Sequence, residues 1–245
     1  MTRHFIQILS LARRYLALLL GTVLLPLNAG ASIVVNGTRL VYPAAEREIT
    51  VKLENDGKSA SLVQVWLDDG DPKKNAADIN LPFLITPPVA RVDTGKSQTI
   101  RMMFAGAPIE GDKELVYWFN VLDIPAGATD TGENKLKLAF RTRIKLFYRP
   151  SGLKGSVDDA PQSLEWKREP DGLRVSNNSA YHVTFSSATL RGSNAQINFE
   201  ERFMIKPGES WQLKTSGLQV KSGDALDIKI INDYGSITDI QAQVR

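Results

Sequence analysis

Cysteine and histidine, two residue types that often act as nucleophiles, bases or metal ligands, are scarce or missing in this 245-residue chain. The sequence has no cysteine, which excludes a thiol nucleophile, cysteine-ligated zinc and iron–sulfur clusters. It has two histidines, and His4 lies in a leader-like segment, so a Ser-His-Asp triad or a histidine-rich metal site is hard to build. The other, His182 in SAYHVTF, borders a predicted strand, where we interpret it as a structural or surface residue.

Paired carboxylates also occur, but in segments that are typical of turns. Asp68-Asp69 and Asp158-Asp159 lie in stretches bordered by glycine and proline. This setting favours solvated turns over general acid–base pairs. No glycine-rich phosphate loop follows a predicted strand. We therefore expect no enzyme activity, no metal and no cofactor.

The first 31 residues have the pattern of a secretory signal peptide. Three basic residues precede the apolar run YLALLLGTVLLPL: Arg3, Arg13 and Arg14. Ala29 and Ala31 then form a small-residue cleavage site, so we expect cleavage after Ala31. A membrane-spanning helix needs about 20 apolar residues, and this run is shorter and is interrupted by glycine and proline. We expect no membrane insertion.

Removal of that segment changes the charge of the chain. It contains three of the 30 lysines and arginines and none of the 27 acidic residues. Subtracting the three leaves 27 basic and 27 acidic residues, and hence no net charge. A globally basic nucleic-acid-binding protein is not supported, so we expect no nucleic-acid partner.

The rest of the chain consists of short strand-like runs separated by turn signals. In EITVKLEN, every second residue is apolar, and Asn-Asp-Gly follows as a strong turn. Runs such as SLVQVWL, PFLITPPV and SQTIRMMF recur at a spacing of about 8–12 residues, without helical periodicity. A second series begins after the polar segment SVDDAPQS. We predict an all-β fold of two immunoglobulin-like β-sandwich domains, residues 32–150 and 151–245.

The run KLKLAFRTRIKLFYRP, residues 135–150, differs from the others because it is apolar on one face and basic on the other. Leu136, Leu138 and Phe140 share one face of an extended strand. Periodicity alone is also compatible with an ordinary strand whose apolar face packs in the protein's own core. An apolar edge strand is prone to aggregation, which flanking basic residues limit. We interpret four residues as solvated guards of this kind: Lys135, Lys137, Arg141 and Arg143.

Several stretches resemble the periplasmic chaperones of the chaperone–usher pilus pathway. They are TRLVY (38–42), TPPVARVDTGKSQTIR (86–101), DKELVYWFNVLDIP (112–125), RTRIKLFYRP (141–150) and INDYG (231–235). Leu115 departs from the family pattern, in which Ser, Thr or Arg is expected. The resemblance covers most of the chain after residue 31 and is strongest before residue 151.

The resemblance implies two immunoglobulin-like domains arranged as an L with an interdomain cleft, in the periplasm. Such chaperones lend an edge strand to pilin (fimbrial) subunits, which lack their last strand, and deliver them to an outer-membrane usher. The lent residues here would be Leu136, Leu138 and Phe140, each contributing about 1.5–3 kcal/mol of transfer free energy. The short loop PAGATDTGEN and the absence of cysteine resemble the short-loop branch. An exposed donor strand would also permit self-association.

Two further groups of residues are implied by the same resemblance. Arg39 and Lys145 would anchor the C-terminal carboxylate of the subunit. Lys145 has the opposite strand parity to the donor residues, and strand twist or a bulge near Thr142 would reconcile the two. A third group matches the family's interdomain salt-bridge network, which would fix the angle between the domains: Glu114, Arg149 and Asp233.

The alternative function is that of a secreted two-domain immunoglobulin-like adhesin or binding module. Such a module needs exposed aromatic platforms or metal ligands in its loops. The loops of this chain are instead rich in glycine, alanine, aspartate and lysine, which favours the chaperone.

Overall fold

The computed structural model describes residues 32–74, 79–107, 109, 111–126, 138–193, 195–199, 203–215 and 219–245. The predicted signal peptide, most of the predicted short loop and Leu136 lie outside these residues. In the described chain the regular structure is β-strand apart from the short 3-10 helix η2 (Ala160–Ser163). No helix in this part of the chain is long and apolar enough to cross a membrane.

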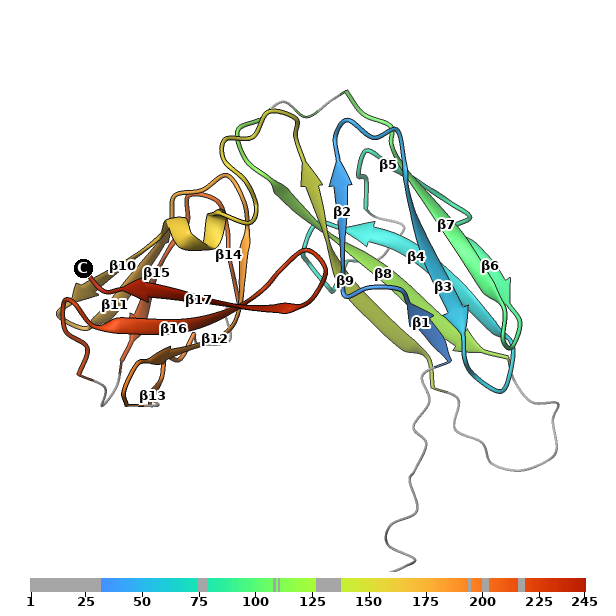
Figure 1. The fold of residues 1–245 in the computed structure, drawn as a ribbon. Helices are drawn as coiled ribbons and strands as arrows, with labels where there is room; N and C mark the ends of the chain where they lie inside the picture. The colour runs from blue at the N-terminus through green and yellow to red at the C-terminus, as the bar shows by residue number, and fades with distance from the viewer. Residues whose placement is uncertain are drawn as a thin grey trace, which may run out of the picture. The chain divides into compact units, whose positions relative to one another are not determined.

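Residues 33–149 form two sheets (Figure 1). The four-stranded sheet has the order β1 (Ile33–Val35), β3 (Ile49–Asn55), β7 (Ser97–Phe104) and β5 (Phe83–Thr86). The five-stranded sheet has the order β2 (Arg39–Pro43), β9 (Phe140–Arg149), β8 (Leu115–Pro125), β4 (Ser61–Asp68) and β6 (Val89–Val92). In the second sheet β2 pairs with β9 in parallel, whereas β9, β8, β4 and β6 pair antiparallel.

One core lies between these two sheets, and the two-residue period of the strands builds it. Val63, Val65 and Leu67 of β4 are buried, while Leu62, which precedes them and points to the other face, is exposed. Tyr42 stacks on Tyr148 with ring centroids 5.8 Å apart. The Tyr42 hydroxyl accepts a hydrogen bond from the Phe104 backbone N–H, which links the two sheets. The buried phenol thus packs its ring and also satisfies its polar end.

The strand-like run PFLITPPV contains β5 and the first residue of β6, which belong to different sheets. Residues 83–86 pair with β7 of the first sheet, and residues 89–92 pair with β4 of the second. Pro87 and Pro88 lie between them. Because proline has no backbone N–H to continue a ladder, the chain leaves one sheet here and enters the other.

Residues 164–243 form a second pair of sheets. One has the order β10 (Leu164–Glu169), β11 (Gly172–Asn177) and β15 (Ser210–Lys214). The other has the order β13 (Ala195–Gln196), β12 (Val183–Leu190), β16 (Ala225–Ile231) and β17 (Ile237–Gln243), and β14 (Met204–Ile205) also pairs with β12. Their shared core contains Trp166, Phe185 and Trp211. The predicted all-β class with two sandwiches is confirmed.

Candidate functional site

β9 has an edge that is only partly covered. Its residues 140–148 pair with β8 on one side. On the other side β2 pairs with it only from Lys145, opposite Arg39, to Arg149, opposite Pro43 (Figure 1). Within the described chain, no strand pairs with residues 140–144 on the β2 side. This segment therefore presents unpaired backbone N–H and C=O groups to which another strand can be added.

Two of the predicted donor residues lie where this open edge begins: Phe140 is the first residue of β9, and Leu138 precedes the strand. Leu138 is 54% exposed and Phe140 is 52% exposed. Leu146 and Tyr148 have the same strand parity, yet they are 0% and 1% exposed. The apolar face of this segment thus continues beyond the protein's own core, and Leu138 and Phe140 are not part of that core.

Lys145 leaves the strand on the opposite face. The β8–β9 ladder runs from Leu115 opposite Tyr148 to Asp123 opposite Phe140 without a register shift. The suggested bulge near Thr142 is therefore wrong. The opposite parity of Lys145 and Phe140 is real, so the predicted donor face and the proposed anchor lie on opposite faces of the strand.

Arg39 and Lys145 are register partners in the β2–β9 ladder. Their side chains leave the same face of strands that lie about 4.8 Å apart. Arg39 Nη1 donates a hydrogen bond to the Ile231 carbonyl oxygen at 2.8 Å, whereas its buried Nε has no hydrogen-bond partner in the described structure. Among the described residues Lys145 has no hydrogen bond or ion pair, and its ammonium lies 5.3 Å from the Trp118 ring centroid. Two adjacent cations with free donors suit a carboxylate.

Burial lowers the pKa of both cations. It lowers the pKa of Lys145, and the neighbouring Arg39 charge lowers it further. Burial also lowers the pKa of Arg39, although Asp233 and Glu114 act in the opposite direction. Both shifts reflect the cost of holding a positive charge in a partly desolvated place, to which the neighbouring like charge adds at Lys145, and a bound anion would offset this cost.

The structure brings Glu114, Arg149 and Asp233 together. Arg149 Nη2 and Nε donate to Glu114 Oε1 at 2.7 and 3.0 Å, and Arg149 Nη1 donates to Asp233 Oδ2 at 2.9 Å. Burial alone would lower the pKa of Arg149, but the hydrogen bonds from its guanidinium to Asp233 and Glu114 raise it. These bonds connect the end of β9 to the turn between β16 and β17.

A fourth member of this network, His182, was not predicted. The second oxygen of Glu114, Oε2, accepts a hydrogen bond from the His182 backbone N–H at 3.0 Å and lies 2.9 Å from its Nδ1. The His182 side chain is 3% exposed, and its ring packs against Phe147. The structural interpretation of His182 thus holds and the surface alternative is wrong. A lone histidine beside a strand is the only signal that the sequence offers.

The turn between β16 and β17 packs closely against the residue that precedes Arg39. Gly235 in this turn has a φ of +81°, which favours glycine. A Cβ at this position would lie 2.4 Å from Thr38 Oγ1. Glycine therefore lets the turn carry Asp233 to Arg149 and the Ile231 carbonyl to Arg39.

The prediction that Asp68 lies in a solvated turn is wrong. Asp68 is 0% exposed at the end of β4. Arg143 Nη2 donates to its Oδ1 at 2.6 Å, and Asn120 Nδ2 donates to its Oδ2 at 2.8 Å. Burial alone would raise the pKa of Asp68, but these hydrogen bonds from Arg143 and Asn120 hold it below its ordinary value.

Arg141 and Arg143, interpreted from the sequence as solvated guards, are only partly solvated. Their side chains are 30% and 21% exposed, and both contact Asp68. The guanidinium carbon of Arg141 lies 4.9 Å from the Trp66 ring centroid. Both arginines are therefore packed on the sheet. Lys135 and Lys137 lie outside the described residues.

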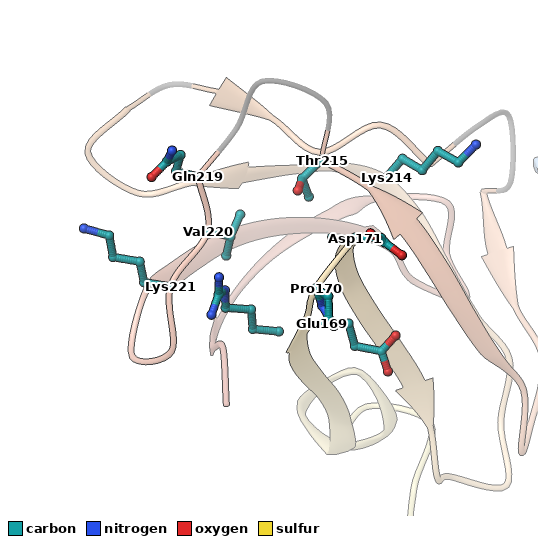
Figure 2. A pocket seen from close by; sticks show the side chains of 10 residues that line it. Glu169, Pro170, Asp171, Lys214, Thr215, Gln219, Val220 and Lys221 are labelled. Atoms are coloured by element: carbon teal, nitrogen blue, oxygen red, sulfur yellow. The ribbon is translucent and has the colours of Figure 1, made fainter.

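A surface hollow at the turn between β10 and β11 is not a candidate site. Residues of both charge signs line it, including Glu169, Asp171, Lys214 and Lys221. In Figure 2 the side chains of Lys214 and Lys221 point away from each other. A ligand site needs a few polar groups that converge, and these do not. The described residues also contain no group of three or more potential metal ligands.

The comparison with protein families identifies the chain. Residues 32–154 match the family described as "Pili and flagellar-assembly chaperone, PapD N-terminal domain", and residues 159–242 match "Pili assembly chaperone PapD, C-terminal domain". The chain belongs to the PapD family of pilus-assembly chaperones. The predicted family membership is thus confirmed.

Individual PapD-family relatives are similar over nearly their whole length. The chaperone protein FimB/FhaD of Bordetella pertussis is 40% identical over 222 residues, which cover 88% of this chain and 89% of the relative. The probable fimbrial chaperone YadV of Escherichia coli K12 is 40% identical over 223 residues, with coverages of 87% and 90%. The crystal structure of the YadV chaperone aligns with a TM-score of 0.72 over 87% of this chain and 100% of that chain.

The salt-bridge network leads to a prediction about stability. Glu114→Ala should lower the free energy of unfolding by about 3–5 kcal/mol, because it leaves buried groups of Arg149 and His182 without their partner. Urea denaturation measures this change. Asp227→Ala is the control, since it breaks an ion pair with Arg191 whose side chains are 47% and 44% exposed, and it should leave stability nearly unchanged. Equal effects of the two substitutions would contradict the structural role of the network.

Proposed function

We propose that this chain is a periplasmic chaperone that completes pilin subunits by lending them the open edge of β9, and that it delivers them to an outer-membrane usher. One observation carries the proposal. Residues 140–144 have an unpaired backbone edge, and at its start Leu138 and Phe140 are more than half exposed. Further along β9, residues of the same parity, such as Leu146, are buried in the core. Addition of a strand to such an edge is a recurring mode of recognition.

The side chains at this edge supply part of the binding free energy. Burial of Leu138 and Phe140 in the open groove of a subunit would contribute about 3–6 kcal/mol together. Leu136, outside the described residues, is expected to add a third apolar contact. Ordering of the subunit subtracts several kcal/mol, so the backbone ladder and the anchor must contribute as well.

The position of β2 supports a specific end point for the added strand. β2 occupies the edge of β9 from Lys145 onward, so a strand added along residues 140–144 meets Arg39 and Lys145. A strand that runs parallel to β9 would bring its C-terminal carboxylate to these two cations. We therefore propose Arg39 and Lys145 as the carboxylate anchor and parallel addition as the orientation.

Two further features support the remaining parts of the proposal. The n-region, apolar run and cleavage site of residues 1–31 favour export to the periplasm with cleavage after Ala31. The contacts of Arg149 with Glu114 and Asp233 join residues of the two sandwiches, so we propose that this network sets their relative orientation.

The donor role predicts a position-specific loss of subunit capture. Leu138→Glu should weaken binding of a pilin subunit from the same organism by about tenfold or more, because a carboxylate replaces an apolar contact. Leu84→Glu is a matched control, since Leu84 is 53% exposed on β5, away from the β9 edge, and it should bind normally. Co-purification and titration calorimetry measure both. An equal loss in the two variants would contradict the donor assignment.

The anchor predicts a particular pH dependence. A bound carboxylate favours the ammonium form and raises the pKa of Lys145, so the free chaperone takes up a proton on binding. Affinity should therefore fall as the pH rises through the lowered pKa of free Lys145, at a lower pH than for an ordinary lysine. In Lys145→Met, binding should be weak and this dependence absent. The same pH slope in both proteins, measured by titration calorimetry, would refute the role of Lys145.

A further inference from the structure

Four residues form one row across the outer face of the five-stranded sheet. The strand registers pair Asp68 with Trp118, Trp118 with Lys145, and Lys145 with Arg39. Register partners leave the same face of a sheet, so carboxylate, indole, ammonium and guanidinium follow one another across β4, β8, β9 and β2. Trp118 is therefore the residue that separates the Asp68 carboxylate from the Lys145 ammonium.

The Asp68 carboxylate is fully occupied by other donors. Its Oδ1 accepts from Arg143 Nη2 and from the Gly70 backbone N–H, the latter at 2.8 Å. Its Oδ2 accepts from Asn120 Nδ2, Arg143 Nε and Arg141 Nη2. The acidic residue in the row of Lys145 is thus committed to other partners.

Each cation of the proposed anchor lies over an aromatic ring. The Trp118 ring centroid is 5.3 Å from Lys145 Nζ and 4.0 Å from the guanidinium carbon of Arg143. The guanidinium carbon of Arg39 lies 6.0 Å from the Phe147 ring centroid. These distances are in the range of cation–π attraction. A ring stabilises an ammonium without supplying the negative charge that would compete with a ligand.

We propose that Trp118 is a positioning residue for the carboxylate anchor. It holds the Lys145 ammonium beside Arg39 and apart from Asp68, while Arg143 neutralises Asp68 behind it. Lys145 then has no ion pair to break when a carboxylate arrives, and its side chain loses less freedom on binding. This inference rests on the proposed function of Arg39 and Lys145.

The test compares a free carboxylate with an uncharged end. The probe is a short synthetic peptide of alternating leucine and threonine, made with a C-terminal carboxylate and as the C-terminal amide. The intact chaperone should prefer the acid. In Trp118→Leu this preference should fall by about two- to thirtyfold, the range of cation–π strengths, with little change in affinity for the amide.

Trp66→Leu is the matched control. Trp66, on β4, lies on the same face of the sheet as Trp118, but its ring contacts Arg141 rather than Lys145. The Trp66→Leu variant should therefore keep the preference for the acid. Trp118→Phe retains an aromatic ring and should keep most of the preference for the acid. If Trp118→Leu does not fold, Trp118→Phe is compared with the parent protein instead. A merely structural role of Trp118 would weaken the acid and the amide equally and leave their ratio unchanged, which would overturn the inference.

A second measurement needs no peptide. In the parent protein, the ring current of the indole should shift the methyl NMR signal of reductively ¹³C-methylated Lys145. In Trp118→Leu, this signal should have the chemical shift of exposed lysines. An unchanged signal would overturn the contact.

The two claims, the carboxylate anchor and the role of Trp118, fail separately. If the parent protein binds the acid and the amide equally, the carboxylate anchor fails; if it prefers the acid and Trp118→Leu retains the full preference, only the role of Trp118 fails.

Discussion

Parallel pairing between β2 and β9 begins at Lys145, and this limit determines where another strand can be added to the protein. Before Lys145, the edge of β9 has unpaired backbone groups and exposed apolar side chains. From Lys145 onward, the same edge is covered and the same apolar face is core. The point of change coincides with two adjacent cations, Arg39 and Lys145. In the proposed function, a partner strand that fills the open segment would end beside these two cations, where they could bind its carboxylate.

The opposite face of β9 shows why the proposed anchor would remain available. Arg141 and Arg143 contact the buried Asp68, and Arg149 contacts Glu114 and Asp233. Lys145 lies between these two groups, and in the described structure it is the cation of this face without an acidic partner. Acidic residues at both ends compensate the arginines, which stabilises a strongly basic strand. In the middle of the strand, the Lys145 ammonium has no acidic partner in the described structure, as the proposed anchor requires.

Local patterns predicted much of this, and long-range contacts account for what they missed. The alternation in residues 135–150 predicted a strand, which the structure has at Phe140–Arg149, and the family motifs pointed to Arg39 and Lys145. The burial of Asp68 was missed because its acidic, glycine-bordered surroundings are typical of a turn, whereas the arginines that cover it come from a strand more than 70 residues later. The bond between Glu114 and His182 joins residues 68 positions apart, which no local pattern reveals. The parity of Lys145 could be read from the sequence, but only the unbroken β8–β9 register showed that no bulge changes it.

Residue-resolved hydrogen exchange by NMR tests the central claim most directly, because it reports on the backbone of the open edge itself. In the free chaperone, the amides of residues 140–144 that do not pair with β8 should exchange rapidly. In the complex with a pilin subunit, the same amides should be strongly protected, since a strand added along this edge accepts their hydrogen bonds. Unchanged exchange at these amides in a saturated complex would contradict the account, because the subunit would then be bound without pairing to β9.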